Sequence, residues 1–191
     1  IGYVLLYNPS YYSSNLIDIF KIWQGGMSFH GGLIGVIIVS IWFAKKNNHN
    51  AFSYLDTISL VAPIGIFFGR ISNFVNSELY GTETSVSWAV KFVKVDEQFR
   101  HPSQLYEAFF EGIVLFMIIN YCNRHKQLGF NSGLYVFGYG FFRFFIEFFR
   151  EPDAHLGFVL FTLSMGQLLC IAMMAGGIMI WILGNRLTTE S

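Results

Sequence analysis

Five long apolar stretches dominate this chain, and each is close to the roughly 20 residues that a helix needs to cross a bilayer. They cover residues 27–44, 58–74, 105–121, 133–149 and 164–183, and residues 1–8 read as the end of a further helix. Only 13% of the residues are charged, against roughly 25% in soluble domains. The sequence therefore predicts an all-α polytopic integral membrane protein with five transmembrane helices and the end of a sixth.

The remaining composition excludes several classes of protein. The formal net charge is zero, so no basic surface for nucleic acid is expected. The two cysteines have no CxxC spacing, and no two histidines have the spacing of metal ligands, so we expect neither a metal nor another cofactor. We predict one transmembrane domain over residues 1–191, truncated at its N-terminus because the sequence enters in the middle of a helical pattern.

Basic residues near the segment ends give an orientation. Lys45 and Lys46 lie in one short loop, and Arg124 and Lys126 lie in another, so these loops are predicted to be cytoplasmic. Residues 9–26, 75–104 and 150–163 then face outward. Residues 86–95 alternate β-branched or aromatic residues with polar ones, which predicts strands. We therefore expect a small extracytoplasmic, β-containing cap within residues 75–104.

Ionisable residues inside the apolar segments are costly and mark sites with a partner or a function. The spacing of Tyr139, Arg143, Glu147 and Arg150 predicts one helical stripe. By the predicted topology, polar groups from four segments reach the outer leaflet together. These groups are His30, Arg70, Asn73, Asn76, Glu78, His101, Gln104, Tyr106, Glu107, Tyr139, Arg143, Glu147 and Arg150.

Two interpretations of these residues remain open. Arg143 could simply neutralise Glu147, and Arg70 could pair with Glu78, as structural ion pairs do; Arg150 could be an interfacial anchor. Alternatively, two buried guanidinium groups match the geometry of phosphate, and the phosphate at that depth is a phospholipid headgroup. A nearby histidine or tyrosine would then offer general-base chemistry.

Glycine spacing predicts where helices approach one another. Gly65 and Gly69 form a small-xxx-small pair, which is typical of close helix packing in membranes.

Four motifs make the chain resemble bacterial prolipoprotein diacylglyceryl transferases. They are GMSFHGGLIG at 26–35, GRISNFVNSELYG at 69–81, RHPSQLYE at 100–107 and YGFFRFFIEFFREPD at 139–153. The resemblance covers about residues 1–153 in order and spacing, and the last segment matches in character more than in sequence. The family has seven membrane helices, so about two are expected to be absent or truncated here. Ser72 departs from the small Gly or Ala that the family usually has before the asparagine.

The resemblance implies a transmembrane catalytic domain and an activity. The family transfers the diacylglyceryl group of phosphatidylglycerol to the lipobox cysteine thiol of a preprolipoprotein, forming a thioether and releasing glycerol phosphate. It implies the bacterial cytoplasmic membrane, with the active site facing the extracytoplasmic leaflet. The catalytic residues carried over are His30, Tyr139, Arg143 and Glu147, and those expected to bind phosphatidylglycerol are Arg70, Asn73, Asn76, Glu78, Arg143 and Arg150.

The individual roles follow from the chemistry. Arg70 and Arg143 would stabilise the leaving phosphate, with Glu78 and Glu147 orienting them. Asn73 would hold a glycerol hydroxyl or a phosphate oxygen. His30 is the expected base that forms the thiolate, and Tyr139 is its rival.

Two other classes of function compete with the enzyme. A membrane anion transporter or channel would have polar residues through both leaflets, whereas the inner halves of these segments are almost wholly apolar. A non-catalytic assembly subunit would use the charges only to pair helices.

Overall fold

The structure of the protein is a computed structural model that describes residues 29–123, 127–151, 158–160 and 163–189. The chain divides into two compact units, residues 1–54 and 55–191. The predicted helix end at residues 1–8 lies outside the described residues.

The first unit contains helix α3, Phe29–Lys46, and the first turn of helix α4, which begins at Ala51. Helix α3 carries exposed apolar side chains and ends on two lysines. The side-chain amide of Asn47 donates to the Phe43 carbonyl over 2.7 Å and satisfies one of the carbonyls that a helix end leaves free. His30 lies in the first turn of α3, and its side chain is outside the described residues.

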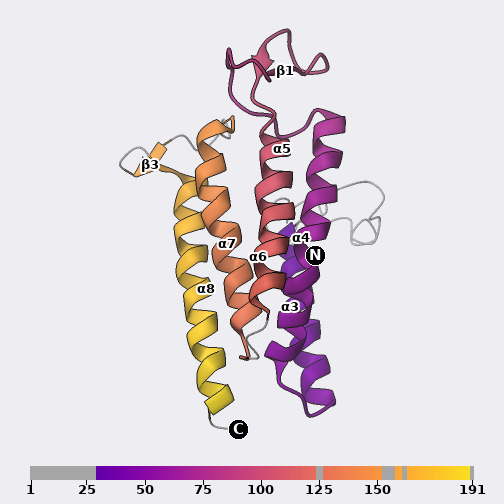
Figure 1. Cartoon of the computed structure of the whole chain (residues 1–191), viewed down its shortest axis with the longest axis vertical. Helices are drawn as coiled ribbons and strands as arrows, with labels where there is room; N and C mark the ends of the chain where they lie inside the picture. Colours follow the sequence, from indigo (N-terminus) through magenta and orange to yellow (C-terminus); the bar gives the residue numbers. More distant parts are fainter. Residues whose placement is uncertain (1–28, 124–126, 152–157, 161–162, 190–191) are drawn as a thin grey trace, which may run out of the picture. The chain divides into compact units, whose positions relative to one another are not determined.

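The second unit is built from long helices that lie side by side, as Figure 1 shows. Helix α4 continues to Asn76, and α5 (Ser103–Glu107), η3 (Ala108–Val114) and α6 (Leu115–Cys122) follow one another without a break. Helix α7 (Phe130–Ile146) runs into a 3-10 turn, η4 (Glu147–Phe149), and then α8 (Met165–Thr189) packs along α7. Among the described residues, the helices at 51–76, 103–122 and 166–187 are long and apolar enough to cross a membrane.

Burial in this chain is the reverse of burial in a soluble protein. Gln104, Glu107 and Glu111 are wholly buried, whereas Phe68 is 65% exposed and Met179 is 60% exposed. Soluble domains seldom bury glutamate fully and seldom leave so many large apolar side chains outside. An apolar surface around a polar interior fits a multi-pass membrane protein.

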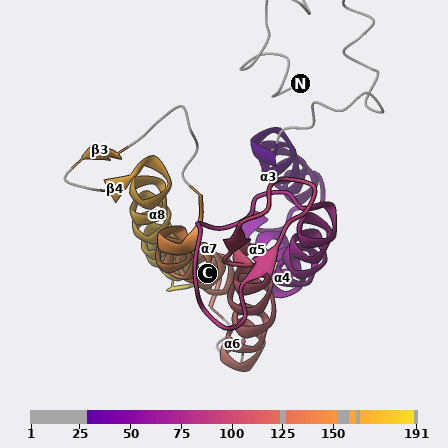
Figure 2. The ribbon, with the colours of Figure 1, turned by 90° about the horizontal axis from the view of Figure 1, so that it is seen from above.

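A small antiparallel sheet forms the cap, which confirms the predicted β-containing segment. Strand β1 (Val90–Lys91) pairs with β2 (Phe99–Arg100), with Val90 opposite Arg100. Arg100 is 7% exposed; its guanidinium contacts Asp96 at 2.7 Å and Glu151 at 2.9 Å. The hydrogen bonds from Arg100 lower the pKa of Asp96. In Figure 2 the cap loop crosses the ends of the helices of the second unit.

A second hairpin, which the sequence analysis did not predict, covers the end of the predicted loop 150–163 and the first residue of the predicted segment 164–183. Strand β3 (Phe158–Leu160) pairs antiparallel with β4 (Leu163–Ser164) directly before α8.

Asp56 of α4 fastens the start of α7 at the end of the unit opposite the cap. One carboxylate oxygen accepts from the Gly129 amide at 2.8 Å, and the other accepts from the Ser132 amide at 2.8 Å and from its hydroxyl at 2.6 Å. Gly129 has φ 75°, a left-handed conformation that favours glycine. The carboxylate thereby satisfies amides at the positive end of α7.

Pro63 interrupts the hydrogen bonds inside α4, because proline has no amide proton. One turn away, the Asn120 side chain of α6 donates to the Leu60 carbonyl over 3.2 Å. The carbonyl that Pro63 leaves without a helical donor is that of Ser59, four residues earlier, so the bond from Asn120 lies beside the interruption and does not replace the missing one.

Glycines allow α7 and α8 to approach closely. A Cβ atom at Gly177 would lie 2.6 Å from the Gly133 carbonyl oxygen, and one at Gly140 would lie 2.9 Å from the Cys170 carbonyl oxygen. By contrast, a Cβ at Gly65 or Gly69 would meet no described atom within 4 Å. The structure places no neighbour against that pair among the described residues, so the packing expected there stays a prediction.

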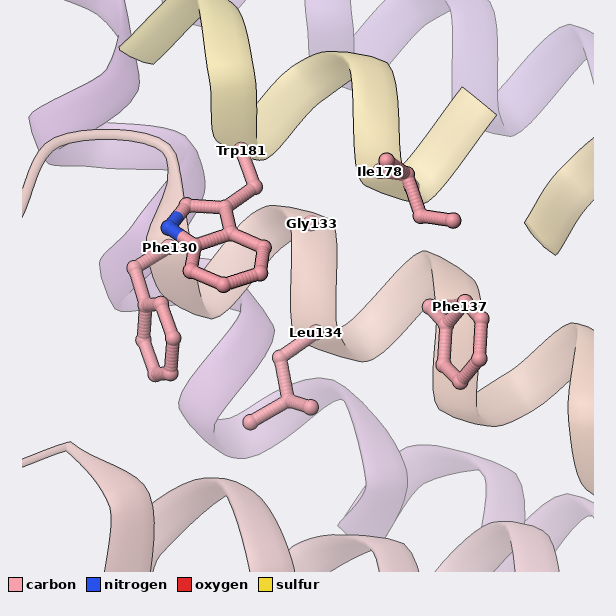
Figure 3. A pocket seen from close by; sticks show the side chains of 7 residues that line it. Phe130, Gly133, Leu134, Phe137, Ile178 and Trp181 are labelled. Carbon is pink, nitrogen blue, oxygen red and sulfur yellow. The ribbon is translucent and has the colours of Figure 1, made fainter. Parts of the chain in front are cut away.

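An apolar cavity of about 330 Å³ lies along the same pair of helices (Figure 3). It is lined by Phe130, Leu134 and Phe137 of α7 and by Ile178 and Trp181 of α8. These lining side chains provide no group for acid–base or nucleophilic chemistry.

Two adjacent glycines of α8 provide a test of this packing. Gly177→Ala should lower the free energy of unfolding by about 1–3 kcal/mol, because the new methyl group overlaps α7. Gly176→Ala should leave it unchanged or raise it by about 1 kcal/mol, since nothing lies within 4 Å of that position and alanine is the better helix former. Thermal unfolding in detergent measures both, and equal effects would contradict the close contact.

Candidate active site

The carboxylate of Glu107 gathers three arginines at the cap end of the second unit. Glu107 ends α5 and is wholly buried. Its Oε2 lies 2.8 Å from Arg70 Nε, and its Oε1 forms an ion pair with Arg143 Nη1 and lies 3.4 Å from Arg150 Nη1. One acid thus joins α4, α5, α7 and the segment after η4.

Glu111 lies one turn further along the same continuous helix and contacts two of these arginines. Its Oε2 is 3.5 Å from Arg70 Nη2, and its Oε1 is 4.0 Å from Arg143 Nη1. Arg70 Nη2 also donates to the Tyr139 hydroxyl over 3.4 Å. Five charged groups and a phenol therefore form one connected cluster.

The local backbone brings Glu111 to Arg70. Residues 108–114 form a π-helix, η3, a conformation that is frequent at functional sites. Gly112, the residue after Glu111, packs against Phe67 of α4. A Cβ atom at position 112 would lie 2.8 Å from the Phe67 Cβ. Because Phe67 lies one turn before Arg70, this close approach holds the two helices together beside the ion pairs.

The predicted helical stripe ends earlier than expected. The α-helical part of α7 ends at Ile146, Glu147 begins the 3-10 turn, and Arg150 has an extended backbone with ψ 144°. Arg150 is therefore not on the helix with Tyr139 and Arg143. It still reaches Glu107, because the chain turns back over the cluster and pairs with Gly81 of the cap.

Glu147 closes the cluster on its far side. Its Oε2 lies 3.0 Å from Arg143 Nη2, and its Oε1 accepts from the Ser164 hydroxyl over 3.3 Å. Arg143 is thus held by three carboxylates, which come from α5, η3 and η4.

Charge and burial are distributed unevenly in this cluster. Three arginines face three glutamates, so the formal charge of these six side chains is zero. Glu107 and Glu111 have no exposed surface, whereas the arginine side chains keep 13–16% of theirs. Among these six side chains, the exposed surface therefore belongs to the three arginines and to Glu147, which is 14% exposed. Guanidinium groups bind anions such as phosphate.

Backbone hydrogen bonds hold the cap next to these residues. The Gly81 amide donates to the His101 carbonyl and the Thr82 amide donates to the Phe149 carbonyl, each over 3.0 Å. His101 Nδ1 shares a hydrogen bond of 3.1 Å with the Tyr106 hydroxyl, next to Glu107 in sequence. Burial lowers the pKa of His101, so its imidazole is neutral at pH 7.

The structure brings together most, but not all, of the residues that the sequence singled out. Those in the cluster are Arg70, Tyr139, Arg143, Glu147 and Arg150. Asn73 lies half-buried one turn after Arg70, and Asn76 and Glu78 are exposed. The side chain of His30 lies outside the described residues.

The predicted partner of Arg70 is wrong. No ion pair of the Glu78 carboxylate occurs among the described residues; instead its backbone carbonyl accepts from Gln104 Nε2 over 2.6 Å. Glu107 and Glu111 orient Arg70. The sequence analysis named Glu107 only as a polar residue and missed Glu111, although two acids four residues apart in an apolar segment were the signal.

Comparisons with known proteins match this chain to one family. Residues 1–183 match the family model described as prolipoprotein diacylglyceryl transferase. The chain is 54% identical to the phosphatidylglycerol–prolipoprotein diacylglyceryl transferase of Rickettsia felis, over all of this chain and 73% of the relative. It is 53% identical to the protein of the same name from Rickettsia bellii, over 93% of this chain and 69% of that relative.

Glu107 should be critical for the stability of the cluster. Glu107→Gln leaves the buried Arg70 and Arg143 short of a counter-charge, and we expect the free energy of unfolding to fall by about 3–5 kcal/mol. Glu97→Gln is the matched control, because Glu97 is 77% exposed and its ion-pair partner among the described residues is Lys91 of the cap; it should change little. Denaturation in detergent measures both variants, and equal stability would refute the central role of Glu107.

Proposed function

The chain belongs to the prolipoprotein diacylglyceryl transferase family, and we propose that it transfers the diacylglyceryl group of phosphatidylglycerol to the lipobox cysteine of a preprolipoprotein. Its relatives carry the name of that activity at 53–54% identity. The observation in the structure that supports the proposal most is the pair Arg70 and Arg143, which lie among apolar helices with side chains that are 16% and 13% exposed.

The arginines would act on the leaving group. The thiolate sulfur attacks the glyceryl carbon that carries the phosphate; a carbon–sulfur bond forms, the carbon–oxygen bond breaks, and glycerol phosphate departs. Charge accumulates on the phosphate as that bond breaks. Preorganised guanidinium donors in a site of low dielectric stabilise this charge without reorganising. Arg150 would add a third donor from the segment beneath the cap.

The base that takes the thiol proton is proposed to be His30, with Tyr139 as the rival. Free thiols have a pKa near 8.5, so a base or a cationic environment increases the thiolate fraction at neutral pH. Tyr139 accepts a hydrogen bond from Arg70 and belongs to the cluster. Glu147 would orient Arg143, which it contacts at 3.0 Å.

The polar residues on α4 and after it have separate proposed roles. Asn73, one turn beyond Arg70, would hold a glycerol hydroxyl or a phosphate oxygen. Asn76 and Glu78 lie at the cap end of α4 and are exposed, so they would contact the lipid headgroup from its aqueous side.

The topology of the whole chain is also a proposal. We infer five crossings, in which α3, with 18 residues, and α7 with η4 join the three longer spans. Basic residues in the short loops support a cytoplasmic position for those loops. The cap and the arginine cluster would then face the extracytoplasmic leaflet of a bacterial cytoplasmic membrane.

The polar groups at the end of the helices opposite the cap argue against a transporter. Asp56 and Ser132 are buried there, and they satisfy one another and the Gly129 amide. Polar groups that are bonded in this way cap a helix rather than line a path for ions.

A transfer assay tests the function. The protein in phosphatidylglycerol nanodiscs should convert a lipobox peptide to its thioether, detected by mass spectrometry, and release glycerol phosphate in equal amount. The matched peptide with serine in place of cysteine should give no product, because its hydroxyl does not ionise near neutral pH. Product from the serine peptide, or no product from the cysteine peptide, would overturn the proposal.

The identity of the base is tested by pH. If His30 is the base, His30→Gln should lower kcat at pH 7 by about 10²–10⁴-fold and remove the fall in rate on the acid side of the wild-type profile. Tyr139→Phe should keep that acid limb. An unchanged rate and profile in His30→Gln would eliminate His30 and leave Tyr139.

A further inference from the structure

The arginine cluster has no spare positive charge for a phosphate. Arg70, Arg143 and Arg150 are balanced by Glu107, Glu111 and Glu147. A phosphodiester headgroup adds one negative charge to a site whose two inner acids are wholly buried. An uncompensated charge at such a place is costly, and buried acids usually avoid this cost by taking up a proton.

The three carboxylates differ in how firmly they are held. Glu107 contacts all three arginines. Glu147 is 14% exposed, lies 3.0 Å from Arg143 and accepts from the Ser164 hydroxyl. These contacts stabilise the negative charge of both Glu107 and Glu147.

Glu111 is held much less firmly. It is wholly buried, its ion-pair distances are 3.5 and 4.0 Å, and its Oε1 has no hydrogen-bond partner among the described residues. The unpartnered oxygens of Glu107 and Glu147 differ, since they lie 2.8 and 3.0 Å from an arginine nitrogen. Glu111 is therefore the carboxylate whose charge is lost at the least cost.

We propose that Glu111 is the exchangeable counter-ion of this site: the lipid phosphate replaces it at Arg70 and Arg143, and Glu111 takes up one proton from the buffer. This inference rests on the proposed function, because it takes phosphatidylglycerol as the anion. The exchange keeps the net charge of the occupied site at zero. It also turns an acceptor into a hydrogen-bond donor beside the leaving group.

The groups that face Glu111 are consistent with this exchange. Arg70 faces it from α4, Glu107 from α5, and Arg143 with Tyr139 from α7. Tyr135 of α7 and Cys170 of α8 also lie within electrostatic range. The arginines stabilise the charged form only while they are free of another anion. Once the phosphate occupies them, the neighbouring Glu107 carboxylate favours the neutral form of Glu111.

Binding should therefore depend on pH through one proton. Uptake on binding makes affinity fall as pH rises, and the apparent Kd should increase by up to about tenfold per pH unit. The titration uses short-chain phosphatidylglycerol and the full chain in neutral-lipid nanodiscs. Calorimetry in two buffers of different ionisation enthalpy counts the protons taken up.

Wild-type protein should take up about one proton per lipid, and Glu111→Gln should take up none and bind with a Kd that no longer depends on pH. Glu97→Gln, which removes an exposed acid of the cap, should behave as wild type. Proton uptake that persists in Glu111→Gln, or that disappears only in His30→Gln, would overturn the proposal.

A second measurement does not require Glu111→Gln to fold. Infrared difference spectra of wild-type protein should gain a protonated-carboxyl band when lipid binds, and Glu111→Asp should shift it. Absence of the band contradicts the proposal. The transfer assay separates the two claims. If wild-type protein transfers diacylglyceryl but takes up no proton on binding lipid, the proposed function stands and the role of Glu111 as exchangeable counter-ion is wrong.

Discussion

The Glu107 carboxylate binds Arg70, Arg143 and Arg150 in an interior from which water is largely excluded. Each partner comes from a different stretch of chain, so the ion pairs form only when those stretches are assembled. Charges in such surroundings must be paired or neutralised. Their pairing therefore fixes the cap end of the helices, and the arginines that it positions are the groups available to an anion.

Backbone features place these side chains where ion pairing alone could not. The π-helix η3 and Gly112 bring Glu111 against α4, and the 3-10 turn after α7 redirects the chain so that Arg150 points back to Glu107. At the opposite end, Asp56 ties α4 to the first turn of α7. The helices that carry Arg70 and Arg143 are thus joined at both ends.

Much of this arrangement follows from the sequence, because membrane helices leave a strong pattern. Length and apolarity located the helices to within several residues, and the cost of buried charge singled out Arg70, Arg143 and Glu147. The partner of Arg70 could not be predicted in the same way. Glu78 is near in sequence, but the side chain that meets Arg70 comes from a helix whose rotation depends on the π-helical segment.

Helix packing at glycine pairs could not be predicted from the sequence for a similar reason. Gly65 and Gly69 have the spacing of a packing motif but face no neighbour among the described residues, whereas Gly133 and Gly177 touch across α7 and α8. Spacing identifies a smooth face on one helix, and only the assembled fold decides whether another helix covers it. The second hairpin before α8 was missed because its strands are two or three residues long.

The central claim is that Arg70 and Arg143 bind the phosphate of the lipid. Solid-state NMR of protein with ¹⁵N-labelled arginine, bound to phosphatidylglycerol, measures the distance from the lipid phosphorus to the guanidinium nitrogens. If the phosphate is hydrogen-bonded to a guanidinium group, the phosphorus and nitrogen atoms should be about 4 Å apart. In Arg143→Lys the signal assigned to Arg143 should disappear. A transfer-active protein whose bound lipid phosphorus couples to neither arginine would contradict the account.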